Sequence, residues 1–308
     1  MPTAFLTHPL FDRYAVPGGH PECPQRVSVI ADELHAQGVY DLLQIVEPEP
    51  ASIAALCRVH TPEYVSTLES LVPAEGFVRV DPDTFLGPDT LSAAKCAAGA
   101  AIAATDLVIG GQADTAFCNV RPPGHHAGRA SAMGFCYFNN VAVGVAQAIA
   151  VHGLRRVAIL DFDVHHGNGT EDIFAGDERV LLCSSFQHPF YPYTGGTSIA
   201  ANIVNVPLEA GCDGPHFREA LVDRWLPAIE RFTPELIYVS AGFDGHAEDE
   251  MAQLLLLDED YRWVSDWIVE LAVRFSSGRI VSCLEGGYAL PALARCAAAH
   301  VRALAGLS

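Results

Sequence analysis

The 308-residue sequence predicts an α/β fold in which one parallel sheet carries helices on both faces. Two observations favour this class. Short apolar runs alternate with longer segments of helical periodicity, and the apolar runs are nearly continuous, as in strands buried on both sides. No low-complexity linker, charge block or repeat divides the chain. We therefore expect a single domain over residues 1–308.

The individual elements follow from these patterns. Strands are predicted at 3–8, 115–120, 156–163, 179–185, 236–242 and 279–286. Helices are predicted at 25–37, 62–71, 89–109, 139–152, 215–231, 259–276 and 290–305. Pro62 and Pro215 mark helix starts, because proline is tolerated in a first turn. Lys95 and Asp106 interrupt the apolar segment 93–111, which favours a core helix over a membrane span.

The composition limits the partners and the compartment. Half of the residues are apolar, and the formal net charge is −19, which argues against binding to nucleic acid or anionic lipid. The acidity equally suits cationic partners or solubility. Nine cysteines without a C-x-x-C pair indicate reduced thiols, and the N-terminus lacks a signal-peptide pattern. We expect a cytoplasmic protein that contacts neither nucleic acid nor membrane.

The stretch "LDFDVHHGNG" (160–169) suggests a metal site. In an extended segment Asp161, Asp163 and His165 project to the same side. A carboxylate and an imidazole suit a borderline ion such as Zn²⁺ or Fe²⁺. Alone, this pattern is better explained as a capped turn at a strand end. Asp244 follows another apolar strand, and the carboxyl ends of parallel strands meet at one edge, so a third ligand favours the metal.

Two further motifs supply proton-handling groups. His125 and His126 are adjacent in "RPPGHHAG", with Asp161 and Asn168 available as partners. A carboxylate partner raises the pKa of a histidine, whereas an amide partner does not. Tyr288 in "EGGY" is a suitable donor to a developing oxyanion. The alternatives are two surface histidines and an ordinary core tyrosine.

An aromatic channel is the last feature of the predicted site. Phe135 and the rings of "HPFYPYTGG" (188–196) are placed to wall a narrow cleft, although core packing explains some of them. Cys136 is better explained as a small hydrophobe than as a nucleophile. No G-x-S-x-G, P-loop or G-x-G-x-x-G motif is present, so serine catalysis and nucleotide binding are unsupported.

Together the motifs resemble one family. "HPECPQR" (20–26), "RPPGHHA", "GFCYFNN", "LDFDVHHGNGT", "SAGFD" and "EGGY" stand in the order and approximate spacing of the histone deacetylase-like family, across residues 20 to about 290. Asn168 occupies a position where class I members typically have Asp, which is similar to the class II and bacterial amidohydrolase branch. The resemblance implies the arginase/deacetylase fold, with a parallel sheet of about eight strands flanked by helices.

The resemblance also implies roles for the site residues. The implied Zn²⁺ ligands are Asp163, His165 and Asp244, with Fe²⁺ as an alternative metal. The implied catalytic set is His125, His126, Asp161, Asn168 and Tyr288. In it His126 is the general base and acid, His125 with Asp161 tunes the site, and Tyr288 contacts the oxyanion. Asn168 is expected to be the neutral partner of His126.

The implied substrate-binding residues are Arg26, Gly134, Phe135, Tyr191, Met251 and Gly287. Phe135 and Tyr191 correspond to the two channel walls, and the Gly134 carbonyl to an acceptor near the amide N–H. Arg26 matches an arginine beside the inner cavity for acetate. Eukaryotic members usually have Phe at Tyr191, and the polyamine-selective branch has glutamate at Met251.

The family also binds K⁺. The resemblance implies one site at Asp161 and the backbone carbonyls of Asp163, His165 and Ser184. A second site is implied at the backbone near Phe174, Asp177 and Val180. We expect structural K⁺ at both positions.

The leading functional hypothesis is a zinc-dependent amidohydrolase that removes acyl groups, most simply acetyl, from lysine side chains of proteins or peptides. The alternative is a deacetylase of small molecules such as acetylpolyamines. The charge of −19 favours a polycation, but Met251 offers no charge to clamp one. A ureohydrolase is disfavoured because Gly245 and His246 follow Asp244 where further ligands are needed. A non-catalytic acyl-lysine scaffold is the remaining option. We expect hydroxamate-type inhibitors to bind. The sequence is also compatible with a homo-oligomer.

Overall fold

The computed structural model describes residues 2–307, and its centre is a sheet of eight parallel strands. Their bounds are β1 (Thr3–Leu6), β2 (Gln44–Val46), β5 (Thr115–Cys118), β6 (Val157–Asp161), β7 (Val180–Gln187), β8 (Ile203–Leu208), β9 (Leu236–Ala241) and β10 (Ile280–Leu284). The strand order is β2-β1-β5-β10-β9-β6-β7-β8. A small antiparallel hairpin is formed by β3 (Val78–Asp81) and β4 (Thr84–Leu86). The predicted α/β class with a parallel sheet is confirmed.

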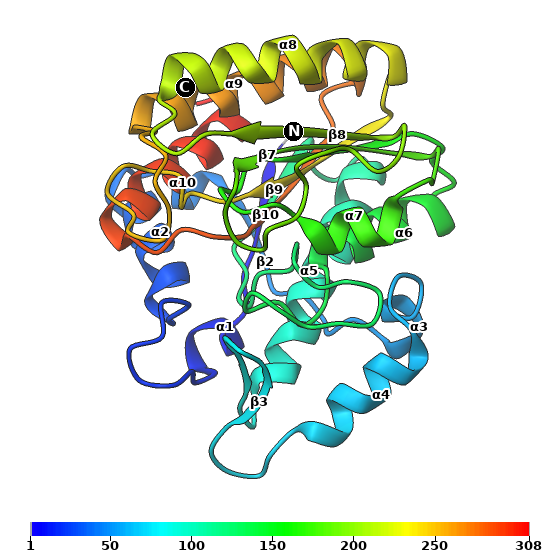
Figure 1. Cartoon of the computed structure of the whole chain (residues 1–308), viewed down its shortest axis with the longest axis vertical. Helices are drawn as coiled ribbons and strands as arrows, with labels where there is room; N and C mark the ends of the chain where they lie inside the picture. The colour runs from blue at the N-terminus through cyan, green and yellow to red at the C-terminus, as the bar shows by residue number, and fades with distance from the viewer. Residues whose placement is uncertain (1, 308) are drawn as a thin grey trace.

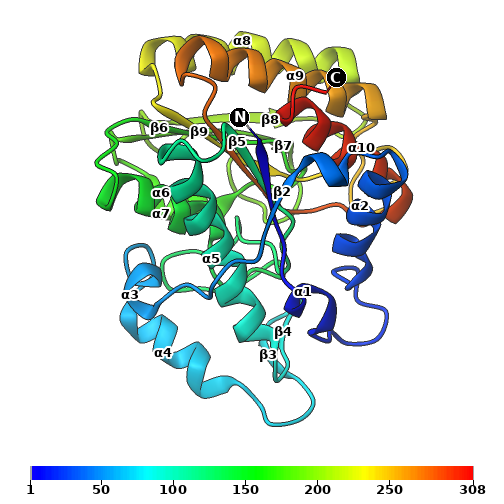
Figure 2. The same ribbon diagram turned by 180° about the vertical axis from the view of Figure 1, so that it is seen from behind.

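Helices cover both faces of the sheet. One layer holds α2 (Gln25–Ala36), α8 (Gly214–Phe232), α9 (Asp258–Phe275) and α10 (Leu290–Leu304), and the other holds α5 (Thr90–Ile109), α6 (Asn140–Ala150) and α7 (Asn168–Phe174) (Figures 1 and 2). The shorter helices are α1 (Leu10–Arg13), η1 (Tyr40–Leu42), α3 (Ile53–Leu56) and α4 (Pro62–Leu71). In both views α3, α4 and the β3–β4 hairpin lie away from the sheet, beside the lower end of α5.

The long apolar helix α5 is a core helix. It is the one helix within residues 2–307 that is long and apolar enough to cross a membrane. However, 61% of its apolar window is buried, and it packs on α6 and on the sheet. Lys95 reaches Glu69 at the edge of this packing, with 2.6 Å between Nζ and Oε1. The expected core role of this segment agrees with its position.

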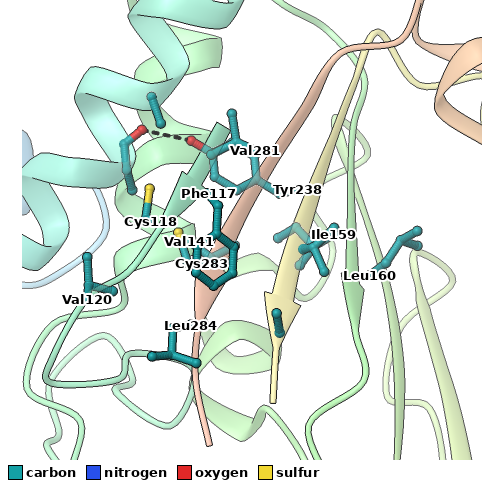
Figure 3. Packing of buried hydrophobic residues seen from close by; sticks show 14 of the residues in the cluster. Phe117, Cys118, Val120, Val141, Ile159, Leu160, Tyr238, Val281, Cys283 and Leu284 are labelled. Atoms are coloured by element: carbon teal, nitrogen blue, oxygen red, sulfur yellow. Dashed lines mark hydrogen bonds between the residues drawn. The ribbon is translucent and has the colours of Figure 1, made fainter. Parts of the chain in front are cut away.

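The buried strands have apolar side chains on both faces, as the continuous patterns predicted. Phe117, Cys118 and Cys283 lie on the paired strands β5 and β10 and are fully buried (Figure 3). Tyr238 of β9 is also fully buried, and its hydroxyl is hydrogen-bonded to Thr105 of α5. A buried phenol needs such a partner, since an unpaired hydroxyl is costly. All nine cysteines are free thiols.

Two outer strands and one strand end differ from the expectation. β2 and β8 were not predicted because β2 has three residues and β8 contains Pro207, which is tolerated at a sheet edge. The strand predicted over 156–163 ends at Asp161. There the Asp161 carboxylate accepts the N–H of Asp163 (Oδ1···N 3.1 Å), so the chain turns. Asp163 and His165 therefore lie in the loop after the strand, not on its extended face.

Candidate active site

A pocket of about 250 Å³ opens beyond the carboxyl ends of β6, β9 and β10. Its lining residues are Asp83, Pro123, His125, His126, Gly134, Phe135, His165, Phe190, Tyr191, Met251, Gly286 and Tyr288. The position agrees with the general rule that open α/β sheets bind ligands at this edge. Loops that are far apart in sequence meet in this one cleft.

The three predicted metal ligands converge beside this pocket. Asp163 and His165 follow β6, and Asp244 follows β9, which pairs with β6 in parallel. His165 Nδ1 lies 3.1 Å from Asp163 Oδ1 and 3.2 Å from Asp244 Oδ2. All three side chains are buried, and their ligand atoms lie within 4.8 Å of one another. The structure therefore brings together one imidazole nitrogen and two carboxylate oxygens.

The backbone orients both carboxylates. Gly286 N–H donates to Asp163 Oδ2 at 2.8 Å, and Val164 N–H donates to Asp244 Oδ1 at 3.1 Å. One oxygen of each carboxylate is thus held, and the other faces His165. A Cβ on Gly286 would lie 1.9 Å from Asp244 Oδ2, so only glycine allows this approach.

The cluster fits a divalent cation. Asp244 Oδ2 is buried and has no hydrogen-bond partner among the described residues. Burial and the neighbouring Asp163 raise the pKa of Asp244. Burial opposes the charged form of His165, but the negative charges of the two neighbouring carboxylates raise its pKa to about 10. A buried group with two carboxylates, one imidazole and an unsatisfied oxygen suits Zn²⁺ or Fe²⁺.

His126 is arranged as a neutral base. Asn168 Nδ2 donates to Met133 Sδ at 3.2 Å, which leaves Asn168 Oδ1 to accept from His126 Nδ1 at 2.7 Å. The proton therefore resides on Nδ1, and Nε2 keeps its lone pair. Burial, together with repulsion from His125 and His165, lowers the pKa of His126 well below its usual value. An unprotonated histidine in the pocket lining can accept a proton.

His125 has the opposite electrostatic environment. Its Nδ1 lies 3.1 Å from Asp161 Oδ2, and its Nε2 lies 3.7 Å from Asp163 Oδ1. Burial alone would favour the neutral ring, but the two carboxylates outweigh it and raise the pKa of His125 to about 10. The carboxylate partner of His125 and the amide partner of His126 thus give two adjacent histidines different pKa values. The direction of this difference agrees with the sequence prediction.

The loop "EGGY" is held against the backbone of Gly124 and His125 and against Arg26 of α2. Glu285 Oε2 accepts the N–H groups of Gly124 (2.7 Å) and His125 (3.1 Å). Burial raises the pKa of this carboxyl to about 7. Arg26 is fully buried, donates from Nε to the Gly287 carbonyl at 2.7 Å, and lies 4.8 Å over the Tyr288 ring. Arg26 and Gly287 therefore support Tyr288 from behind, whereas the tyrosine itself lines the pocket.

Aromatic rings line the approach to the ligands. Tyr191 contacts His126 edge-on, with 5.4 Å between ring centroids, and Phe135 contacts Tyr288 in the same way at 5.9 Å. Phe190 stacks on His165 at 5.7 Å. Gly134 has φ +55, and a Cβ there would lie 2.3 Å from the His126 ring, so the chain passes close to the base. The predicted residues Phe135, Tyr191 and Gly134 all border the pocket.

The β3–β4 hairpin positions Phe135. Asp83 Oδ1 accepts the N–H of Gly134 at 3.2 Å, and Thr84 Oγ1 accepts that of Phe135 at 3.1 Å. Phe135 takes φ 68, a left-handed conformation that a phenylalanine adopts only when its surroundings impose it. Asp83 itself lines the pocket. The sequence interpretation missed Asp83, because one carboxylate in a polar turn carries no distinguishing signal.

Asp249 was also missed. Its Oδ2 accepts the N–H groups of Tyr288 (2.6 Å) and Ala289 (2.9 Å), and its Oδ1 accepts that of Met251 (3.0 Å). The carboxylate is buried at the N-terminal end of α10, where negative charge is favourable. It joins the loop of Met251 to the backbone of Tyr288. Its place in the acidic run "AEDE" (247–250) gives it no distinguishing sequence signal.

The predicted K⁺ residues fall into two different environments. Ser184 of β7 is paired in register with Asp161 of β6, both are fully buried, and the Ser184 hydroxyl has no partner among the described residues. At the second position the carbonyls of Phe174, Asp177 and Val180 also converge. However, the side-chain nitrogen of Asn202 lies between them and donates to all three.

Comparisons with known proteins agree with this geometry. A family model described as "Histone deacetylase domain" matches residues 20–304. The histone deacetylase-like amidohydrolase of Pseudomonas aeruginosa is 38% identical over 296 residues, which cover 94% of this chain and 78% of the relative. The polyamine deacetylase HDAC10 of Mus musculus is 34% identical over 302 residues, which cover 92% of this chain and 45% of the relative.

A solved structure of the HDA15 HD domain superimposes with a TM-score of 0.92 at 31% identity, covering 100% of this chain and 90% of that one. The chain belongs to the histone deacetylase family, with the arginase/deacetylase fold. It is a hydrolytic deacetylase of a metal-dependent family that usually uses zinc. The family relationship expected from the motifs is confirmed.

Proposed function

We propose that the chain is a zinc-dependent amidohydrolase that hydrolyses the acyl amide of N-ε-acyl-lysine, most simply the acetyl amide. One observation carries the proposal. The cluster of Asp163, His165 and Asp244 lies beside the same narrow pocket that His126 lines, and His126 Nε2 has a free lone pair. A metal-binding group and a neutral base in one cleft are what amide hydrolysis by water requires.

When bound by these three ligands, zinc would polarise the amide carbonyl and acidify the attacking water. His126 Nε2 takes the proton of the water and returns a proton to the leaving amine nitrogen. The Nδ1–H of His126 stays hydrogen-bonded to Asn168 Oδ1, and this bond holds the ring in one tautomer. His125 and its partner Asp161 tune the charge beside the base. The Tyr288 hydroxyl donates to the amide oxygen as negative charge develops there.

The pocket suits a linear alkyl chain. Phe135 and Tyr191 would flank the methylenes of the acyl-lysine, and the carbonyl of Gly134 would accept its amide N–H. Met251 adds an apolar contact at the pocket. Arg26 and Gly287, behind Tyr288, would border the product acetate. We also propose a structural K⁺ at Asp161 and the carbonyls of Asp163, His165 and Ser184, supported by the unpartnered Ser184 hydroxyl.

Acetylpolyamines are the second candidate substrates. The Asp83 carboxylate in the pocket lining favours a ligand with an ammonium group near the scissile amide. A curated relative is named as a polyamine deacetylase. Met251 favours acyl-lysine instead, because an apolar residue gives a second ammonium no counter-charge.

The test compares substrates on one metal-defined preparation. Protein loaded with Zn²⁺, and separately with Fe²⁺, is assayed with lysine peptides of rising acyl length and with acetylated polyamines. We expect acetyl-lysine peptides to be hydrolysed faster than polyamines and a hydroxamate to inhibit. The proposal fails if the Zn²⁺ protein hydrolyses none of these and His126→Ala behaves identically. A cytoplasmic location and the oligomeric state remain predictions for fractionation and light scattering.

A further inference from the structure

A group of backbone carbonyls outside the active site is filled by a side chain of the protein. The carbonyls of Phe174, Asp177 and Val180 lie at the end of α7, in the following loop and at the start of β7. Backbone hydrogen bonds from Asp177 N to Phe174 O and from Val180 N to Asp177 O, each 3.0 Å, bring them to one side of the segment. Three converging carbonyl oxygens make a site of negative potential that needs a cation or a donor.

Asn202 supplies that donor. Its Nδ2 lies 2.8 Å from the Phe174 oxygen, 3.2 Å from the Asp177 oxygen and 2.9 Å from the Val180 oxygen. These are hydrogen-bond distances, and the amide NH₂ has two hydrogens to share among the three acceptors. The centre of the carbonyl group is therefore occupied by nitrogen, which leaves no room for an ion.

The orientation of the amide is fixed by its other end. Asn202 Oδ1 accepts the N–H of Gly176 at 2.9 Å. The reverse orientation would set the amide oxygen against three carbonyl oxygens and its NH₂ against an N–H, so the network admits one assignment. The backbone holds the residue in place as well, because the carbonyl of Asn202 accepts Leu182 N–H at 2.9 Å. The amide is thus bonded at both ends and anchored to the edge of β7.

The local charge is balanced without an ion. The carboxylate of Asp177 is bound by Arg179, with Nη2···Oδ2 at 2.7 Å and Nε···Oδ1 at 2.9 Å. That pairing lowers the pKa of Asp177 and leaves it no net demand for a second cation. This donor set therefore does not fit a bound K⁺, although the three carbonyls are those expected to hold one.

We infer that Asn202 replaces the second K⁺ of the fold in this chain. The side-chain amide makes the contacts that the cation would make, so the α7–β7 connection keeps its shape in the absence of K⁺. Removal of the amide would leave the three carbonyls without the donor that now lies between them and would convert the position into a K⁺ site. The inference concerns this segment alone and does not depend on the substrate of the enzyme.

The first test locates the cation directly. Crystals of the zinc-loaded chain and of its Asn202→Ala variant are soaked in Tl⁺, an anomalous scatterer that mimics K⁺. We expect no anomalous peak among the carbonyls of Phe174, Asp177 and Val180 in the unsubstituted chain and a clear peak there in Asn202→Ala. A peak at that position in the unsubstituted chain would overturn the inference, because the amide would then have moved aside for the ion.

The second test uses thermal unfolding in KCl against choline chloride, whose cation is too large to enter. A ligand that binds only the folded state raises Tm. We expect the K⁺-induced rise in Tm for Asn202→Ala to exceed that of the unsubstituted chain by about 2 °C or more. Asn202→Asp keeps the size of the side chain but recruits a cation, so it should respond at least as strongly and serves if the alanine variant does not fold.

The matched control is Asn205→Ala, three residues further along the chain, in β8. Asn205 Nδ2 donates to Glu171 Oε2 at 2.7 Å and to none of the three carbonyls. Its loss leaves the carbonyl group unchanged, and Glu171 keeps His166 Nε2 at 3.3 Å as a partner. Its K⁺-induced shift should equal that of the unsubstituted chain, which includes any K⁺ bound beside Asp161. The inference is wrong if both Asn202 variants show the same shift as Asn205→Ala and no Tl⁺ peak.

Discussion

Two clusters of residues that could hold a metal ion both draw on the loop after β9, and they differ sharply in how their charges are paired. The first is Asp163, His165 and Asp244, and the second is His246, Asp258 and Cys296. In the second cluster Arg295 binds both oxygens of Asp258, with Nε···Oδ2 at 2.7 Å and Nη2···Oδ1 at 3.1 Å. No comparable arginine touches the first cluster within the described residues.

The proton positions differ as well. His246 Nδ1 accepts the N–H of Glu248 at 3.1 Å, so Nε2 carries the proton and donates to Asp258 Oδ1 at 2.9 Å. Burial and Asp258 raise the pKa of the Cys296 thiol, so this sulfur stays protonated. Every side chain of the second cluster thus has a hydrogen-bond partner for its potential metal-binding atom, whereas Asp244 Oδ2 of the first cluster has none among the described residues.

Cavity size does not separate the two clusters. A cavity of about 580 Å³ borders Asp258 and Arg295, and the pocket at the first cluster measures about 250 Å³. Residue type does not separate them either, because both clusters contain a histidine and a carboxylate. Compensation by an arginine is the distinguishing property, since a metal cation binds more readily where no permanent cation is already paired with the carboxylates.

The largest effect is expected for Asp163→Ala. The variant should lose its tightly bound zinc and at least about 10³-fold in turnover, because the metal supplies several kcal/mol of transition-state stabilisation. Zinc content after dialysis and turnover of an acetyl-lysine peptide measure both. Asp258→Asn is the matched control and should keep one zinc and its activity. Zinc retained in Asp163→Ala but lost in Asp258→Asn would reverse the comparison.

A smaller loss is expected for Tyr288→Phe, which leaves the first cluster intact. Loss of one oxyanion donor lowers kcat by about 10²–10³-fold and changes KM much less, since the hydroxyl acts mainly as charge develops. Zinc content should stay unchanged. Equal losses in kcat and in substrate binding would contradict the oxyanion role.

Asp249→Ala tests the loop that runs between the two clusters. The carboxylate positions the Tyr288 backbone and does not touch the substrate pocket, so we expect kcat to fall by about 10-fold with little change in KM. The control is Glu250→Ala at the exposed neighbouring residue, which should leave kcat nearly unchanged. When Asp249→Ala is added to Tyr288→Phe, kcat should fall little further than in Tyr288→Phe alone. Fully additive losses would show that Asp249 acts independently of Tyr288.

The sequence predicted the elements with strong local signals. α4 begins at Pro62 and ends at Leu71 as expected, because proline, the Thr61 cap and an apolar stripe agree there. β8 was missed since Pro207 contradicts a central strand, and only the sheet order shows that it lies at an edge. Local patterns carry no information on such long-range order.

The same limit applies to the site. The convergence of Asp163, His165 and Asp244 was predictable because parallel strands bring their carboxyl ends to one edge. Asp249 and Asn202 were missed because each acts through backbone groups, on Tyr288 and on Phe174, which have no sequence signature. The sequence predicted the direction of the pKa difference between His125 and His126. It did not predict which atom each histidine contacts, because that depends on the three-dimensional structure.

The smallest effect is expected for Arg295→Ala, which removes the cation from the second cluster. The Arg295–Asp258 pair is half-exposed and is worth at most about 1 kcal/mol, so stability should change little. We expect Asp258 to become free for a metal, and a weak second equivalent of Co²⁺ to bind with a thiolate charge-transfer band from Cys296.

Arg302→Ala, at the same cavity, should bind no second equivalent of Co²⁺, and adding Cys296→Ser to Arg295→Ala should abolish the band. If the unsubstituted chain already binds the second equivalent, charge compensation is not what separates the two clusters. If Arg295→Ala binds none, the engaged protons of His246 and Cys296 suffice to exclude the metal.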